Sequence, residues 1–290
     1  MAFNGITEAA FLLMETKDQY AVYGNPVKHS KSPQIHAAFA EQTGQQLHYR
    51  ARKVELEHFA EAATKFFSHG GKGLNITVPF KLEAFEFADQ LSGRARRAGA
   101  VNTLALQEDG SIYGDNTDGV GLVRDIHSNL GWELSGRRIL VLGAGGAVRG
   151  ILGPLLKQGP AHVLVANRTV AKAQSLAKNF ESLGHVAGCS YEGLTSGQFD
   201  LIINGTSASM RGDLPPLPHH ILSNDGCAYD MMYGAQPTPF MRWAAGETAW
   251  AVSDGLGMLV EQAAESFCIW RGVRPGTKPV MDLIRQSLSR

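Results

Sequence analysis

The chain has 290 residues, with 27 basic and 27 acidic side chains, and therefore carries no net formal charge. This length is enough for two domains with separate cores. A neutral chain without a long basic run is not expected to bind nucleic acid or an anionic membrane surface. The apolar stretch at 9–14 is short and flanked by Glu8 and Glu15, so we expect neither a signal peptide nor a membrane span, and a cytoplasmic protein.

The cysteines and histidines predict no metal site. The three cysteines, Cys189, Cys227 and Cys268, are widely spaced and odd in number, which fits a reducing compartment rather than a disulfide framework. The ten histidines show no metal-ligand spacing. We therefore expect chemistry that does not depend on a bound metal.

The first half of the chain alternates between strands and helices. Residues 1–18 are expected to be an appended segment. Pro33 suits the first position of a helix, with Ser32 as its N-cap. Strands are predicted at 19–23, 47–54 and 73–78, helices at 33–43, 56–69 and 79–91, and a hairpin from 101–106 and 111–113. This alternation predicts a mainly parallel open sheet in an α/β domain.

The second half continues the alternation and predicts a second α/β domain. Helices are expected at 118–130, 148–156, 255–270 and 278–289, and strands at 138–142, 162–166, 185–189, 199–203, 226–230 and 248–252. Two such domains leave a cleft between them, which is a common place for a small-molecule site.

A glycine-rich loop joins the strand at 138–142 to the following helix. Backbone N–H groups and the helix dipole make such a junction an anion site. In Gly143-Ala-Gly-Gly-Ala147, Gly143 permits the tight turn and Gly145 lets a pyrophosphate approach the backbone. Val148 stands where the usual pattern has Gly or Ala, and this departure affects the packing of helix against strand.

The segment after the second nucleotide strand favours NADP over NAD. An NAD enzyme usually has an acid there to bind the ribose 2′-hydroxyl, but no acid occurs between His162 and Asn179. Arg168 stands there instead, with Lys172 one helical turn later, and two cations suit a 2′-phosphate. The alternative is a solvated basic corner at an ordinary helix start.

Lys81 and Asp118 are candidates for proton transfer. A lysine in the first turn of a helix opposes the helix dipole, and a lysine that can lose its proton can shuttle one. Asp118 precedes a helix and could hold the lysine in place. The alternatives are a snorkelling surface lysine and an ordinary capping aspartate.

Other polar residues could face the cleft. Ser30 and Ser32, beside a helix start, would form a carboxylate cradle. Thr77, Asn102 and the loop at 204–207 follow or begin strands at an edge where ligands bind in open α/β sheets. Taken singly, each could also be a capping or turn residue.

Several uncommon strings, in order, resemble shikimate dehydrogenases from about Tyr20 to the C-terminus. They are Tyr23-Gly-Asn-Pro-Val-Lys-His-Ser-Lys-Ser-Pro33, Asn75-Ile-Thr-Val-Pro-Phe-Lys81, Gly99-Ala-Val-Asn-Thr103, Gly114-Asp-Asn-Thr-Asp-Gly119, Gly143-Ala-Gly-Gly-Ala147, Asn167-Arg-Thr169, Tyr229-Asp-Met-Met-Tyr233 and Asp254-Gly-Leu-Gly-Met258. The resemblance implies NADPH-dependent reduction of 3-dehydroshikimate to shikimate, in aromatic amino-acid biosynthesis.

The resemblance also implies roles for individual residues. Lys81 and Asp118 match the family's catalytic pair. The matches to its substrate contacts are Ser30, Ser32, Thr77, Asn102, Tyr233 and Gln262. The matches to its cofactor contacts are Gly143, Ala144, Gly145, Gly146, Ala147, Asn167, Arg168, Thr169, Lys172, Met231 and Gly255. Gly205 departs from the family, which often has Ala there.

The resemblance further implies how the chain divides. In the family the C-terminal helices return to the first domain, which Gln262 needs if it touches substrate. The expected division is 1–117 with 255–290 for substrate and 118–254 as a Rossmann-type NADP-binding domain. Two alternatives stay open: a quinate/shikimate dehydrogenase of broader range, and a non-catalytic NADP-binding scaffold on the same fold. A monomer or a homodimer is expected.

Overall fold

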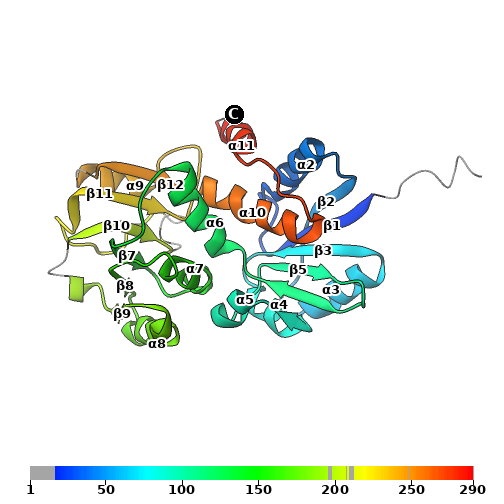
Figure 1. The fold of residues 1–290 in the computed structure, drawn as a ribbon, viewed down its shortest axis with the longest axis horizontal. Helices are drawn as coiled ribbons and strands as arrows, with labels where there is room; N and C mark the ends of the chain where they lie inside the picture. Colours follow the sequence, from blue (N-terminus) through cyan, green and yellow to red (C-terminus); the bar gives the residue numbers. More distant parts are fainter. Residues whose placement is uncertain (1–16, 195–197, 207, 209–211, 248, 290) are drawn as a thin grey trace, which may run out of the picture.

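The computed structural model describes residues 17–194, 198–206, 208, 212–247 and 249–289. Most of the expected N-terminal segment, Ser207 and the first residue of the strand expected at 248–252 lie outside these ranges. The described chain forms two six-stranded sheets with helices packed on them, side by side along the long axis (Figure 1). The predicted class, an α/β protein of two domains, is confirmed.

The first sheet has the strand order β2-β1-β3-β5-β6-β4. Its strands are β1 (Asp18–Gly24), β2 (Leu47–Lys53), β3 (Gly71–Ile76), β4 (Gln90–Leu91), β5 (Thr103–Leu106) and β6 (Ile112–Asp115). β1 pairs in parallel with β2 and β3, and β4 does so with β6. The predicted hairpin, β5 and β6, adds the antiparallel pairings. The expected mainly parallel open sheet is therefore present.

Two predictions about the helices of this half are wrong. The helices are α2 (Ser32–Thr43), α3 (Phe59–Ser68), α4 (Lys81–Phe87) and α5 (Gly93–Ala98). Ser32 begins α2, and the N-cap is Lys31 without a side-chain cap. The helix expected at 79–91 begins at Lys81 and ends at Phe87. Asp89 instead pairs with the backbone of Ile112, because its N–H donates to the Ile112 carbonyl and its carboxylate accepts from the Ile112 N–H. That contact recruits Gln90–Leu91 to the sheet edge as β4.

The second sheet is parallel throughout, in the order β12-β11-β10-β7-β8-β9. Its strands are β7 (Arg138–Leu142), β8 (His162–Ala166), β9 (Val186–Cys189), β10 (Phe199–Asn204), β11 (Leu222–Asp230) and β12 (Ala251–Asp254), and its helices are α6 (Asp118–Arg124), α7 (Gly146–Leu156), α8 (Val170–Phe180) and α9 (Pro239–Gly246). The helix expected at 118–130 continues past α6 as a π-helical turn, Asp125–Asn129.

The last strand lies later than predicted. The strand expected at 248–252 is β12, Ala251–Asp254, because Ala249 still bonds back to Ala244 of α9 through its N–H. No helix was expected where α9, Pro239–Gly246, lies. β12 pairs with β11 in the register Cys227↔Ala251, so pairing with β11 sets where the strand begins.

The two C-terminal helices return to the first sheet. α10 (Leu256–Arg271) runs from the second sheet back across the molecule, and α11 (Lys278–Leu288) lies beside α2 (Figure 1). Ile35 and Phe39 of α2 share a buried core with Val260 and Phe267 of α10. This packing carries Gln262 to the first half of the chain. None of the helices in the described ranges is long and apolar enough to span a membrane.

Candidate active site

An ion pair joins the starts of two short helices between the sheets. α4 begins at Lys81 and α6 at Asp118, and Lys81 Nζ lies 2.5 Å from Asp118 Oδ2. The other carboxylate oxygen, Oδ1, accepts a hydrogen bond from Asn102 Nδ2 at 2.8 Å. The Lys81 side chain keeps 19% of its surface exposed, against 9% for Asp118. The ammonium is therefore held in a fixed place yet remains accessible to a ligand.

Asn102 connects this pair to α10. Its Oδ1 accepts from the Thr117 backbone N–H at 2.9 Å, and its Nδ2 donates to Thr117 Oγ1 at 2.9 Å. Gln262 Oε1 lies 3.3 Å from Asn102 Nδ2 and 3.3 Å from Thr117 Oγ1. The structure therefore brings Lys81, Asp118, Asn102 and Gln262 together. Thr117, which sequence reasoning did not single out, holds the Asn102 amide in its orientation.

A buried polar network connects to these residues through Thr117. Asn75 accepts from the Tyr49 hydroxyl at 2.7 Å and donates to Ser266 Oγ at 3.0 Å, and Ser266 Oγ lies 3.3 Å from Thr117 Oγ1. His36 stacks on Tyr49 with ring centroids 4.2 Å apart. Burial lowers the pKa of His36 to about 3 and raises the pKa of Tyr49. This network was not predicted from the sequence. Asn75 and Thr117 lie in two of the strings that resemble the family, 75–81 and 114–119, but no motif of the sequence contains Ser266.

The remaining substrate candidates lie on the elements around this network. Ser30 Oγ donates to Ser32 Oγ at 3.2 Å where α2 begins, and it accepts from the Ser32 backbone N–H at 3.3 Å. Thr77 follows β3, and its N–H donates to the carbonyl of Tyr23 at 2.9 Å. Tyr233 packs against the core of α2 and α10, the helices that carry Ser32 and Gln262. Burial raises the pKa of Tyr233.

The glycine-rich loop at the end of β7 has the geometry of an anion site. Gly143 has a φ of +100°, which favours glycine. A Cβ on Gly145 or on Gly146 would meet no atom within 4 Å, and both residues are exposed at the start of α7. Open backbone at a helix N-terminus fits the pyrophosphate of a dinucleotide. Ala144 and Ala147 lie in the same loop.

The other cofactor candidates gather at the same edge of the sheet, after the carboxyl ends of parallel strands. Gly255 follows β12, and a Cβ there would lie 2.3 Å from the carbonyl oxygen of Met231, which follows β11. These two segments can therefore pack this closely only with glycine at 255. Asn167, Arg168 and Thr169 follow β8, and Lys172 lies in the first turn of α8.

Arg168 and Lys172 are both exposed at the start of α8. Neither has an ion pair within the described part of the chain, so their charges are free to meet an anion. The Asn167 side chain donates to the Thr169 carbonyl at 2.9 Å and fixes the turn. Two cations beside a helix N-terminus fit a phosphate monoester on the ribose.

The helix of the glycine-rich loop also touches the catalytic candidates. A Cβ on Gly150 of α7 would lie 2.8 Å from Asn116 Oδ1 and 3.2 Å from Asp118 Oδ2. The absence of a side chain at 150 therefore lets α7 lie directly against the start of α6. Among the described residues, no group of three or more His, Cys, Asp or Glu side chains could hold a metal ion.

Three family models match successive parts of the chain. They are the shikimate dehydrogenase substrate-binding domain over residues 22–104, shikimate/quinate 5-dehydrogenase over 124–211, and the shikimate 5′-dehydrogenase C-terminal domain over 255–285. The NADP(+) shikimate dehydrogenase of Cellvibrio japonicus is 58% identical over 271 residues, 93% of this chain and 98% of that protein.

Solved structures are similar over the same span. The chain matches an Ael1 enzyme from Pseudomonas putida with a TM-score of 0.87 and 49% identity, over 92% of this chain and 98% of that one. It matches a shikimate 5-dehydrogenase from Thermus thermophilus, in complex with NADP(H) and shikimate, with a TM-score of 0.83 and 33% identity, over 93% and 100% of the two chains.

Proposed function

The chain belongs to the shikimate dehydrogenase family, and from that premise we propose how its residues perform the family's reaction. The protein is an NADP-dependent oxidoreductase that reduces 3-dehydroshikimate to shikimate, a step of aromatic amino-acid biosynthesis. The observation that carries the proposed mechanism is the contact between Lys81 Nζ and Asp118 Oδ2 at 2.5 Å, in which the Lys81 side chain stays 19% exposed.

The nicotinamide, when bound, supplies the hydride that the substrate ketone accepts. Lys81 donates a proton to the oxygen on which negative charge develops, and takes it back in the reverse direction. Asp118 holds the Lys81 ammonium in position through Oδ2, while Asn102 Nδ2 donates a hydrogen bond to Asp118 Oδ1. A positioned donor of this kind contributes about 10²–10⁴-fold in rate.

We assign the substrate carboxylate to Ser30 and Ser32, whose hydroxyls lie 3.2 Å apart at the start of α2. Thr77, Asn102, Tyr233 and Gln262 are assigned to the remaining polar groups of the substrate. The cofactor is assigned to the carboxyl edge of the second sheet. Its pyrophosphate is placed on the loop at 143–147 and its 2′-phosphate on Arg168 and Lys172, with Asn167, Thr169, Met231 and Gly255 beside them.

The domain boundaries are part of this proposal. We place the substrate domain at 1–117 with 255–290 and the NADP domain at 118–254, because α10 and α11 share a core with α2. We further propose a cytoplasmic protein that acts as a monomer or a homodimer and does not bind nucleic acid. The absence of net charge supports the last point.

A double-mutant cycle on Lys81 and Asp118 tests the mechanism. Lys81→Ala should lower kcat by about 10²–10⁴-fold and change KM modestly, because the donor acts in the transition state. Adding Asp118→Ala to Lys81→Ala should lower kcat much less than Asp118→Ala lowers it in the unaltered chain, since the two residues act as a unit. Near-normal turnover of Lys81→Ala would remove Lys81 from the role.

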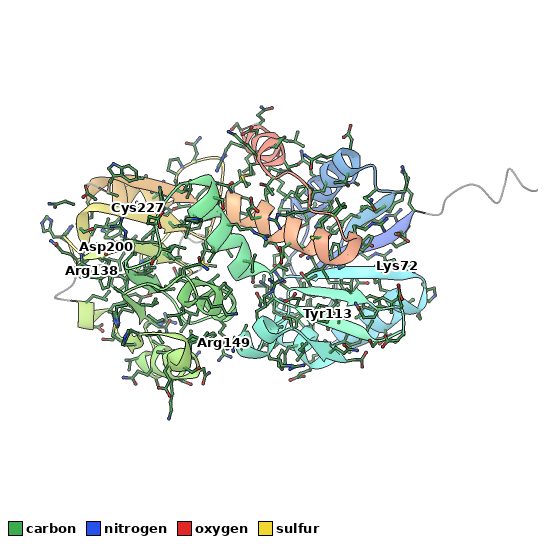
Figure 2. The ribbon with its side chains drawn as sticks, in the orientation of Figure 1. Lys72, Tyr113, Arg138, Arg149, Asp200 and Cys227 are labelled. Carbon is green, nitrogen blue, oxygen red and sulfur yellow. The ribbon has the colours of Figure 1, made fainter. Side chains whose placement is uncertain are left out.

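Two controls accompany the cycle. Lys72→Ala removes an exposed lysine near the start of β3 (labelled in Figure 2), which makes no hydrogen bond to the pair, and should leave kcat unchanged. Circular dichroism checks that each variant is folded. Assays with shikimate or quinate, each with NADP or NAD, separate the proposed reaction from a quinate dehydrogenase of broader range and from a scaffold without activity.

A further inference from the structure

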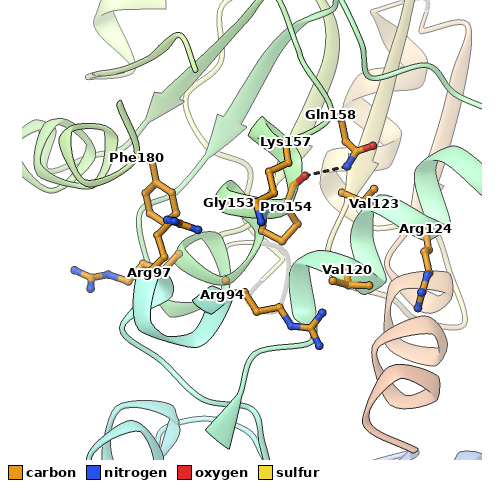
Figure 3. A pocket seen from close by; sticks show the side chains of 12 residues that line it. Arg94, Arg97, Val120, Val123, Arg124, Gly153, Pro154, Lys157, Gln158 and Phe180 are labelled. Carbon is orange, nitrogen blue, oxygen red and sulfur yellow. Dashed lines mark hydrogen bonds between the residues drawn. The ribbon is translucent and has the colours of Figure 1, made fainter. Parts of the chain in front are cut away.

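A cavity lies where helices of the two halves meet, with a volume of about 270 Å³ (Figure 3). Neither Lys81 nor Asp118 lines it, nor does any residue of the loop at 143–147. Its walls come from α5 on one side, α6 on another, and α7 with the end of α8 on the third. The cavity is therefore distinct from the site assigned to substrate and cofactor.

The floor of this cavity is apolar. Val120 and Val123 of α6, Pro154 of α7 and Phe180 of α8 line it. Gly153 also lines it, and a Cβ there would lie 3.4 Å from Phe180 Cε1, which is an ordinary contact. Gly153 could therefore be replaced by a residue with a side chain, and its lack of one leaves space in the cavity. Such a surface suits the hydrocarbon part of a small ligand.

The rim is strongly cationic. Five lining residues are basic and none is acidic: Arg94, Arg97, Arg124, Arg149 and Lys157. Arg94 and Arg124 share carboxylates outside the lining, since both pair with Glu265 and Arg94 also pairs with Asp115. The other three have no ion pair anywhere in the described ranges.

These three cations come from two sides of the cavity. Arg97 belongs to α5 and Arg149 to α7, and Lys157 directly follows the last residue of α7. Arg97 and Lys157 are labelled in Figure 3. Arg149 reaches toward α5, because its Nη1 lies 3.6 Å from the position of a Cβ on Gly99 (Figure 2). Unpaired charges of one sign around a concave, low-dielectric surface focus the field and attract a counter-ion.

We propose that this cavity binds a small organic phosphate monoester. The apolar floor takes the organic part, and Arg97, Arg149 and Lys157 take the phosphate. The two negative charges of a phosphate dianion complement three cations better than the single charge of a carboxylate does. Arginine also binds phosphate through two parallel N–H donors. The ligand touches helices of both halves of the chain.

Calorimetric titration with phenyl phosphate tests the site. The full chain is first saturated with NADPH and shikimate, a pair that cannot react, so that the anion positions at Arg168 and at Ser30 are already filled. Phenyl phosphate should give saturable heat at one site. Inorganic phosphate, which lacks the ring, and benzyl alcohol, which lacks the charge, should bind more weakly.

Two variants address the two parts of the cavity. The double variant Arg97→Gln with Lys157→Gln should lower the affinity for phenyl phosphate by about tenfold or more, which corresponds to the loss of one charged hydrogen bond. Gly153→Leu should fill the floor and abolish binding. Arg96→Gln with Lys178→Gln removes two exposed cations of α5 and α8 outside the lining, and should leave the affinity unchanged.

The proposal is overturned if phenyl phosphate gives no saturable heat. It is overturned equally if the Arg97 and Lys157 double variant binds as the unaltered chain does, or if the Arg96 and Lys178 control loses as much affinity. Should Gly153→Leu fail to fold, the charge variants still decide the question.

Discussion

The side chain of Val148 occupies the space in which a Cβ on residue 205 would lie. Such a Cβ would be 2.4 Å from Val148 Cγ2 and 3.1 Å from Met231 Sδ. Val148 is fully buried. The sequence pattern leads us to expect Gly or Ala at 148, and the resemblance leads us to expect Ala at 205; the chain has a larger residue at 148 and a smaller one at 205. The two residues are therefore complementary in size, because the missing side chain at Gly205 leaves the space that the larger Val148 side chain fills.

This relationship predicts a rescue. Gly205→Ala should lower the free energy of unfolding by about 1–3 kcal/mol, the usual cost of overpacking, and should weaken NADP binding by displacing Met231. Adding Val148→Ala should recover part of both losses, with a coupling energy of about 0.5–3 kcal/mol. Urea unfolding and NADP titration measure the two quantities. Strictly additive effects would show that the contact does not matter.

A matched variant of the same loop separates stability from binding. A Cβ on Gly145 meets no atom within 4 Å, and its backbone is extended, with φ −85° and ψ −177°. Gly145→Ala should therefore leave the free energy of unfolding nearly unchanged. It should still weaken NADP binding, because the methyl group would stand where the pyrophosphate approaches.

Arg168 is predicted to select NADP over NAD. Arg168→Ala removes a cation that could bind the 2′-phosphate, and should weaken NADP binding by about tenfold or more while changing NAD binding little. Fluorescence titrations with both reduced cofactors measure the ratio. Lys178→Ala removes an exposed cation two turns further along α8 and serves as the control. Equal losses for the two cofactors would disprove the assignment.

The serine pair is predicted to act on substrate rather than on the stability of α2. Ser30→Ala and Ser32→Ala should each raise the KM for shikimate and leave NADP affinity nearly unchanged. Ser32 is not the N-cap of α2, and Ser30 Oγ accepts a single hydrogen bond from the Ser32 N–H at 3.3 Å, so melting temperatures should change little. Steady-state kinetics and thermal melts provide the comparison, with Ser111→Ala in the distant hairpin as the control. A lower melting temperature without a change in KM would favour a structural role.

His36 is predicted to make folding sensitive to mild acid. Burial lowers its pKa from 6.5 to about 3, so between these values the unfolded chain binds a proton that the folded chain does not. Stability should therefore be complete above about pH 6.5 and fall by about 1.4 kcal/mol for each pH unit below it, toward pH 3.

His36→Gln should remove this part of the pH dependence and keep a donor near Asn75, whose Oδ1 lies 3.2 Å from His36 Nε2. Urea unfolding at a series of pH values gives the slope for each variant. His48→Gln, which removes an exposed histidine of β2, is the control. An unchanged slope in His36→Gln would assign the acid sensitivity to other groups.

Elements with strong local signals could be predicted from the amino-acid sequence. The apolar run, glycine turn and helix start of 138–156 predicted β7, the loop and α7, because dihedral preferences and helix periodicity act over a few residues. The position of Arg168 after β8 is equally local. The resemblance to known family members extended this reading to Lys81 and Asp118 as a pair.

Contacts between groups far apart in the chain depend on the folded arrangement of the whole molecule. Lys81 and Asp118 are 37 residues apart, and Thr117 meets Gln262 across 145 residues, so no local pattern could give their distances. The same holds for β4 and β12, whose bounds depend on pairing with β6 and β11. Ser266 and His36 gained their partners, and Val148 its complement in Gly205, only when side-chain packing fixed which atoms fill each buried space.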